Sequence, residues 1–169
     1  MRMRAFVDDD LAALTDLTID TFRPFFEDVF RPLMGETIFT VQHGSWRDDY
    51  RRQVAGLHAP ERHAYVTVAE MTGMTGMTGM SGEIAGYVAW AVDPDRRHGQ
   101  IVILAVSPQH RRHHLGATLC RHAFEQMRLL GAEIVEIATG GDAFHAPARA
   151  LYEQLGCTAN PVAVYFRRL

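Results

Sequence analysis

The stretch "AVSPQHRRHHLGATL", residues 105–119, constrains this chain most, because it joins an apolar segment to a helical pattern through a basic loop. The preceding residues 99–106 are almost continuously apolar at their end, which predicts a central, buried strand. After the loop, apolar residues recur at helical spacing: Leu115, Leu119, Ala123, Met127 and Leu130. Gly131 then offers a helix end. A buried strand leading into an amphipathic helix predicts a domain built on one sheet covered by helices.

The start of this predicted helix is a candidate anion site. The first backbone N–H groups of a helix have no partner within it, and the helix dipole is positive there. Gly116 and Ala117 are small enough to let an anion approach, while Arg111 and Arg112 add charge and paired donors. A pyrophosphate site is one interpretation. A solvated basic loop is the other, and this stretch alone does not decide between them.

The rest of the chain alternates between strand and helix patterns. Strands are predicted at residues 2–6, 64–70, 83–92, 133–139 and 161–169, and helices after Asp8–Asp10 and at 45–57 and 146–156. Residues 23–36 contain Pro24 and Pro32, which predict a short helix and a turn. The tandem repeat at 71–82 predicts a flexible hairpin loop without chemistry of its own. This order predicts a mixed α/β or α+β fold.

Length and charge limit the classes of function. A chain of 169 residues predicts a single domain over 1–169, and a net charge of −3 argues against a general nucleic-acid binder. No apolar run reaches the length of a membrane span. Cys120 and Cys157 stand far apart in apolar contexts, which favours free thiols in a reducing compartment. We therefore expect a cytoplasmic protein.

Two motifs resemble signatures of the GNAT superfamily of acyl-CoA-dependent N-acyltransferases. The family loop [RQ]-x-x-[GA]-x-[GA] follows a Val-x-Pro, and here Val106 and Pro108 precede Arg111-x-x-His114-x-Gly116. His114 stands where the family usually has Gly or Ala. The second segment, "HAPARALYEQLGC", is similar to the family's N-x-x-A-x-x-x-Y-x-x-x-G-[FC], with matches at Ala148, Tyr152, Gly156 and Cys157. The resemblance runs from about residue 64 to the end.

The resemblance implies a fold and a cofactor. The fold would have three layers, with a twisted, mostly antiparallel sheet of six or seven strands that splays at the cofactor site and helices on both faces. The cofactor would be acetyl-CoA. The residues expected to contact it are Leu104, Ala105, Val106, Arg111, Arg112, His113, His114, Leu115, Gly116, Ala117, Thr118, His145, Ala148 and Tyr152.

The resemblance also assigns catalytic roles. The Val106 N–H would polarise the thioester carbonyl, and Tyr152 would protonate the departing sulfur. The family's glutamate base has no counterpart, because residues 99–106 carry no carboxylate. His98, Asp142 and His145 remain candidates, as does a chain of water molecules. His145 is included among the predicted catalytic residues. We predict no metal site, because adjacent histidines in the 110–114 loop point apart and lack further ligands nearby.

The acceptor cleft of such enzymes is built largely from the first two helices. Here that region combines aromatic and acidic residues, which suit a cationic amine. The predicted acceptor residues are Phe26, Glu27, Asp28, Trp46 and Asp142. Alternatively, the phenylalanines form core and the acids a solvated face.

Three functions therefore stand. The first is acetylation of a small cationic amine, with resistance-type modification of aminoglycoside antibiotics as the leading example. The second is acetylation of a protein N-terminus or lysine, and the third is a non-catalytic CoA-binding module. A homodimer is expected, because dimers are frequent in the family.

Overall fold

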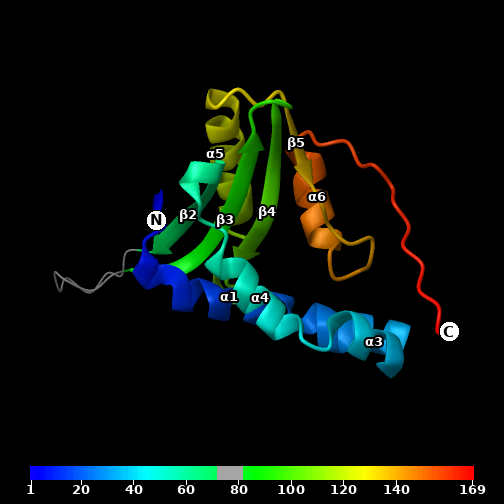
Figure 1. The fold of residues 1–169 in the computed structure, drawn as a ribbon. Coiled ribbons are helices and arrows are strands. Elements are labelled where there is room, and N and C mark those ends of the chain that lie inside the picture. The colour runs from blue at the N-terminus through cyan, green and yellow to red at the C-terminus, as the bar shows by residue number, and fades with distance from the viewer. Residues whose placement is uncertain (72–81) are drawn as a thin grey trace.

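The structure, a computed structural model, describes residues 1–71 and 82–169 and is organised around one five-stranded sheet (Figure 1). The strands follow chain order across the sheet: β1 (Arg2–Ala5), β2 (Ala64–Met71), β3 (Glu83–Asp93), β4 (His98–Val106) and β5 (Ile134–Ile137). Neighbouring strands pair antiparallel, except that β4 and β5 are parallel. The predicted mixed fold with a mostly antiparallel sheet is confirmed, with five strands in place of six or seven. Most of the predicted repeat loop at 71–82 lies outside the described residues.

Helices cover both faces of the sheet. On one face, α1 (Leu11–Pro24) and α4 (Trp46–Ala55) bury a cluster around Leu14, Val68 and Tyr87. On the other face, α5 (Leu115–Leu129) buries a second cluster with Trp90 and Leu119. The three-layer arrangement expected from the resemblance is therefore present (Figure 1).

The N-terminal helix corrects the prediction for residues 23–36. Neither proline breaks it: α1 continues past Pro24 into a π-helical turn at Phe25–Phe30 and then into α2 (Arg31–Met34), which contains Pro32. Arg31 donates its backbone N–H to the carbonyl of Phe26, five residues back. Because a π-turn shifts the hydrogen-bond register, the helix tolerates residues that would interrupt a regular α-helix. The chain turns only at Gly35, where φ is +79°, before α3 (Glu36–His43).

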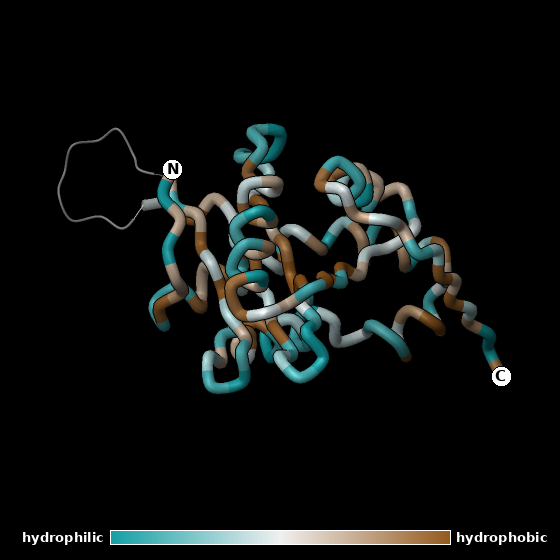
Figure 2. The backbone as a smooth tube through the Cα atoms, turned by 90° about the horizontal axis from the view of Figure 1, so that it is seen from above, coloured by the Kyte–Doolittle hydropathy of each residue, from teal (hydrophilic) through white to brown (hydrophobic). Residues whose placement is uncertain are grey.

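The strand predicted at 161–169 is wrong. Residues 157–169 form no regular secondary structure after α6 (Ala146–Gln154), and they run along the outside of the molecule (Figure 2). Val162, Val164 and Tyr165 are exposed, and Phe166 contacts the Phe30 ring at 6.0 Å between centroids. The β-branched and aromatic residues of this segment are compatible with a strand, but a strand also needs a paired backbone.

The pairing of β4 with β5 is short, and this creates the splay expected at the cofactor site. Parallel pairing runs from His98–Ile134 to Ile101–Ile137 and ends there. On its other side β4 stays paired with β3 to Val106, with an irregularity that leaves Val102 without a direct partner. Such a bulge bends a strand locally. The β5-facing edge of residues 102–106 is therefore open.

Candidate functional site

A cleft of about 410 Å³ occupies the space where β4 and β5 part. Its walls come from four places: the β4 edge, the segment after β5, α6 and the N-terminal helices. The lining residues are Phe22, Phe25, Tyr50, Gln53, Ile101, Val102, Ile103, Leu104, Ile137, Ala138, Thr139, Gly140, His145, Ala148 and Tyr152. Three residues of the second motif, His145, Ala148 and Tyr152, thus line the cavity, whereas the residues of the first motif, 106–116, do not.

Tyr152 lies in the cleft wall, as expected from the second motif. Burial raises the pKa of its phenol well above its usual range, with the nearby thiols of Cys120 and Cys157 adding to the effect. The hydroxyl therefore keeps its proton at neutral pH. A protonated phenol in a cleft can donate that proton to a leaving group.

The predicted anion site lies at the start of α5. Leu115 and Ala117 are buried, while the preceding residues 111–114 are exposed. No side chain among the described residues caps this helix. Its first N–H groups are therefore available to an outside acceptor, and the helix dipole favours an anion there.

The loop before α5 has unusual backbone geometry. Arg112 and His114 adopt left-handed conformations, with φ of 64° and 58°. A left-handed position is easiest for glycine, which accounts for the small residue that the family usually has at the His114 position. Here a histidine takes the same conformation, so the loop geometry survives at some cost in strain. Arg111 folds back and donates from Nε to the Val106 carbonyl at 3.1 Å.

Gly116 also lies at a close contact between elements. A Cβ there would lie 3.2 Å from Leu151 on α6 and 3.8 Å from Leu104 on β4. Its missing side chain therefore allows α5, α6 and β4 to pack closely. Thr118 is already satisfied, since its N–H bonds the His114 carbonyl at 3.0 Å.

A carboxylate–imidazole pair borders the cleft just before α6. His145 Nδ1 lies 2.7 Å from Asp142 Oδ2, and the His145 backbone N–H donates to Asp142 Oδ1 at 3.2 Å. The two side chains are only 14% and 20% exposed. Burial opposes ionisation of Asp142, but its bonds to His145 hold the pKa of the carboxyl below its usual range.

The loop that carries this pair is tightly held. Arg149 on α6 donates from Nη1 to the carbonyls of Gly140 at 2.5 Å and Asp142 at 2.7 Å. A Cβ on Gly140 would collide with Asp142 Oδ2 and with His145 Nδ1. The loop is thus shaped around the pair.

The acceptor side of the cleft differs from the predicted set. Its wall is formed by Phe22, Phe25, Tyr50 and Gln53, which were not among the predicted acceptor residues. The aromatic run of residues 22–30 was the available signal, but it does not tell which rings face a cavity. Burial raises the pKa of Tyr50 to about 12, so this phenol also stays neutral.

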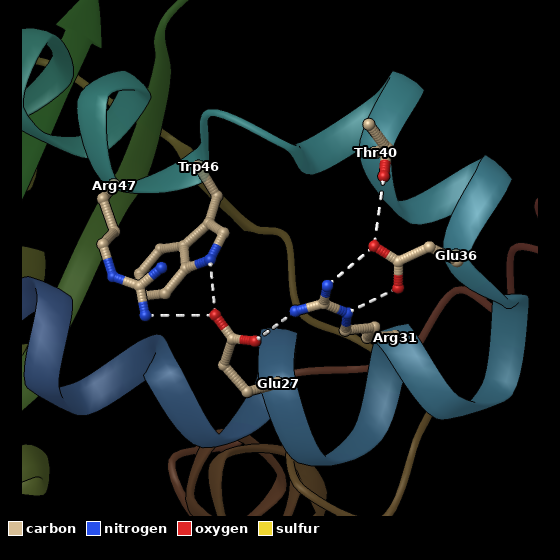
Figure 3. Close-up of polar contacts among 6 residues, drawn as sticks. All are labelled: Glu27, Arg31, Glu36, Thr40, Trp46 and Arg47. Carbon is tan, nitrogen blue, oxygen red and sulfur yellow. Dashed lines mark hydrogen bonds and ion pairs between the residues drawn. The ribbon is translucent and has the colours of Figure 1, made fainter.

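The predicted acceptor residues of the helices lie elsewhere. Phe26 and Trp46 are buried and stacked on each other at 4.6 Å between ring centroids. Glu27 accepts from Trp46 at 3.3 Å and pairs with Arg31 and Arg47 at 3.0 Å each (Figure 3). None of these residues lines the cleft, and neither does the exposed Asp28. Of the predicted acceptor set, Asp142 alone is next to the cleft, through its contact with His145.

Three further observations concern a metal site, the candidate base His98 and membrane-spanning helices. Among residues 1–71 and 82–169, no group of three or more His, Cys, Asp or Glu side chains lies close enough together to hold a metal ion. His98 pairs with Glu136 at 3.3 Å at the far end of β4 and does not line the cleft. No helix in the described part of the chain is both long enough and apolar enough to span a membrane.

The splayed sheet, the helix start without a side-chain cap and the phenol in the cleft are the features expected of an acyl-CoA-dependent transferase. The model of the acetyltransferase (GNAT) family matches residues 20–157. The chain therefore belongs to the GNAT acetyltransferases, whose acyl donor is acetyl-CoA.

Two curated relatives match this chain over stretches shorter than the family match. The mycothiol acetyltransferase of Beutenbergia cavernae is 40% identical over 76 residues, covering 45% of this chain and 24% of that protein. The uncharacterized N-acetyltransferase YsnE of Bacillus subtilis is 32% identical over 84 residues, covering 44% of this chain and 56% of that protein. The matches thus span about a quarter and just over half of these curated relatives.

Solved structures share the fold over nearly the whole chain. A GNAT acetyltransferase from Brucella melitensis in complex with acetyl-CoA has a TM-score of 0.60 at 18% identity, covering 94% of this chain and 82% of that one. The aminoglycoside antibiotic 6'-N-acetyltransferase of Acinetobacter haemolyticus has a TM-score of 0.64 at 13% identity, covering 100% and 99%. At these identities the similarity establishes the fold alone.

Proposed function

We propose that this chain transfers the acetyl group of acetyl-CoA to a primary amine. The observation that carries the proposal is the parting of β4 from β5 after Ile101 and Ile137, which opens a cleft lined by β4 and by the second motif. The first N–H groups of α5, with Arg111 and Arg112 beside them, would hold the diphosphate. The open edge of residues 104–106 would bind the pantetheine arm as an added strand.

Two groups would act on the thioester. The Val106 N–H would polarise its carbonyl, and Tyr152 would protonate the departing sulfur. The Tyr152 phenol is protonated at neutral pH, so it holds the proton that the departing sulfur would take up.

The acceptor we propose is a small molecule whose amine has apolar neighbours. Phe22, Phe25 and Tyr50 form an aromatic wall that would contact such a molecule and, by cation–π attraction, its ammonium form. Aminoglycosides remain the second candidate, favoured by the acidic N-terminal helices. The acids Glu27, Asp48 and Asp49 are however each paired with arginine, which leaves them less able to bind a polycation.

We also propose that the chain forms a homodimer through its C-terminal segment. β5 is the last strand of the sheet, so its outer edge is open, and Ile134 on it is exposed. Residues 161–169 carry the exposed apolar side chains of Val162, Val164 and Tyr165, residue types that favour strands. Open edges and exposed strand-like segments favour pairing between chains. Light scattering after gel filtration should give twice the monomer mass, and deletion of residues 161–169 should give the monomer.

The function is tested by binding and turnover measured separately. Calorimetry should show acetyl-CoA binding, and a thiol assay should show CoA release with an acceptor drawn from aromatic monoamines, aliphatic monoamines, aminoglycosides and peptides. Tyr152→Phe should lower kcat about hundredfold or more while binding persists. Absence of acetyl-CoA binding would overturn the proposal. Binding without turnover on any amine would favour the CoA-binding module.

A further inference from the structure

We infer that His145, oriented by Asp142, takes up the proton that the acceptor amine loses. The inference rests on the proposed acetyl transfer and supplies the base that β4 lacks, since no carboxylate occurs in residues 99–106. The argument depends on how the imidazole is held, on where its second nitrogen lies, and on which other groups are available.

The imidazole is held by one of its nitrogens. Nδ1 bonds to Asp142 at 2.7 Å, and since an ionised carboxylate only accepts, Nδ1 carries the proton. In neutral histidine the other nitrogen, Nε2, is then an unprotonated acceptor. No hydrogen bond to Nε2 comes from any residue within the described ranges. The pair therefore presents a free basic nitrogen.

The surroundings restrict where this nitrogen can point. The rings of Phe25 and Phe144 meet the imidazole edge-on at 4.8 and 4.9 Å between centroids. His145 lines the same cleft as Tyr152 and the aromatic wall. The two phenylalanine rings also lie 5.9 Å apart, so the three rings pack in a triangle, and an imidazole packed there and bonded at Nδ1 has restricted rotation. It is thus a fixed base rather than a mobile surface histidine.

The loop before α6 positions the imidazole. Asp142 also receives the His145 backbone N–H at 3.2 Å, a contact that does not require an imidazole at position 145. A Cβ at Gly140 would collide with both members of the pair, and Arg149 donates to the carbonyls of Gly140 and Asp142. These contacts hold the loop, and with it the imidazole, in place.

The other titratable groups around the cleft are poorer bases. Tyr50 on α4 and Tyr152 on α6 have raised pKa values and stay protonated, and Arg149 is a permanent cation. Asp142 faces His145 and is held ionised by it. The neutral imidazole of His145, with its proton on Nδ1, can accept a second proton at Nε2.

His145 and Tyr152 together account for every proton transferred in the reaction. Acetyl-CoA supplies the activated acetyl group: the amine nitrogen bonds to the carbonyl carbon, the C–S bond breaks, and sulfur leaves with the electron pair. His145 Nε2 accepts one proton from the amine nitrogen and becomes an imidazolium that Asp142 stabilises. Tyr152 donates its hydroxyl proton to the sulfur. The imidazolium then returns a proton, through solvent, to the Tyr152 oxygen.

The first experiment compares His145→Asn with His122→Asn. Asparagine is the residue that the GNAT motif usually has at position 145, and His122 is a half-buried histidine on α5 outside the cleft. With the best acceptor of the panel, His145→Asn should lower kcat/KM roughly hundredfold at pH 7.5 and remove the acid limb of the pH–rate profile. Acetyl-CoA should still bind His145→Asn, because asparagine is the usual residue of the motif there, and should bind His122→Asn within about threefold of the parent. His122→Asn should keep both the rate and the limb.

The second experiment needs no turnover. Nitrogen NMR of the free protein at pH 8, with the His145 signals assigned by their loss in His145→Asn, should show a protonated Nδ1 and a bare Nε2. A protonated Nε2, or an unchanged pH profile in His145→Asn, would overturn the inference while leaving acetyl transfer intact. An inactive parent protein would instead contradict the proposed function.

Discussion

Glu27 and Asp142 are both carboxylates bonded to an aromatic ring nitrogen, of Trp46 and His145 respectively, but they differ in their other partners. Glu27 has three donors around it, namely Trp46, Arg31 and Arg47 (Figure 3). Asp142 instead bonds one imidazole whose second nitrogen remains free. The Glu27 carboxylate is neutralised by two arginines and stabilises the packing of the helices. The Asp142 carboxylate instead orients a histidine that lines the cleft. The residue type alone therefore does not show which acid serves chemistry.

The largest expected effect comes from crowding the Asp142–His145 pair. Gly140→Ala introduces a Cβ that would collide with both side chains, so kcat/KM should fall roughly hundredfold. The neighbouring Gly141→Ala is the matched control, because its Cβ would meet nothing within 4 Å. Initial rates of CoA release measure the difference. Equal rates in the two variants would mean that the pair is not needed.

Asp10 extends the comparison to a carboxylate buried for stability. Arg4 bonds it twice, at 2.6 and 2.7 Å, and thereby lowers the pKa of Asp10 from its ordinary 3.8. A depressed carboxyl pKa stabilises the fold above that ordinary value, and the contribution is lost as pH falls through and below about 4. Asp10→Asn should cost about 2 kcal/mol at pH 7 and flatten this acid dependence. Urea unfolding at pH 7 and pH 3 tests both points.

Glu27→Gln should have a smaller effect, on stability only. The amide keeps the shape but loses two ion pairs whose arginines are 42% and 45% exposed, so the expected cost is about 1 kcal/mol. Urea unfolding measures it, and the acceptor KM should stay within about twofold. A tenfold rise in KM without loss of stability would instead place Glu27 at the acceptor, as the sequence predicted.

The smallest effect is expected at Asp48. It pairs with Arg51 on the exposed side of α4, with 62% of its side chain accessible. Asp48→Asn should leave the KM of every acceptor, aminoglycosides included, within about twofold, because such surface charges are screened. A selective rise in KM for aminoglycosides at low salt would favour the polycation as acceptor and weaken the proposal of an apolar amine.

The strand–loop–helix of residues 99–130 could be predicted because its signals are local. A run of apolar residues, a basic loop and a stripe at helical spacing require no information from elsewhere in the chain. The motif resemblance predicted that the sheet splays. The structure shows this splay where β4 continues beyond the end of its pairing with β5. The Tyr152 position followed in the same way from its spacing within α6.

The wrong secondary-structure predictions all concern segments whose structure depends on long-range contacts. Pro24 and Pro32 predicted a break, but a π-turn packed through Phe26 and Phe30 carries the helix through. Residues 161–169 have the residue types of a strand but pair with none of the five strands that the structure describes. Sequence patterns report the preferences of a segment, and they do not report which backbone or core lies next to it.

The sequence by itself determined the family and the positions of its two motifs, because these depend on spacing along a few turns and strands. Only the tertiary structure decided which polar groups remain available for chemistry. Arg31 and Arg47 come from different helices to neutralise Glu27, while Asp142 and Gly140 shape a loop around His145. Whether a carboxylate is satisfied or left to orient a neighbour depends on groups brought together in space, and spacing along the chain does not encode that directly.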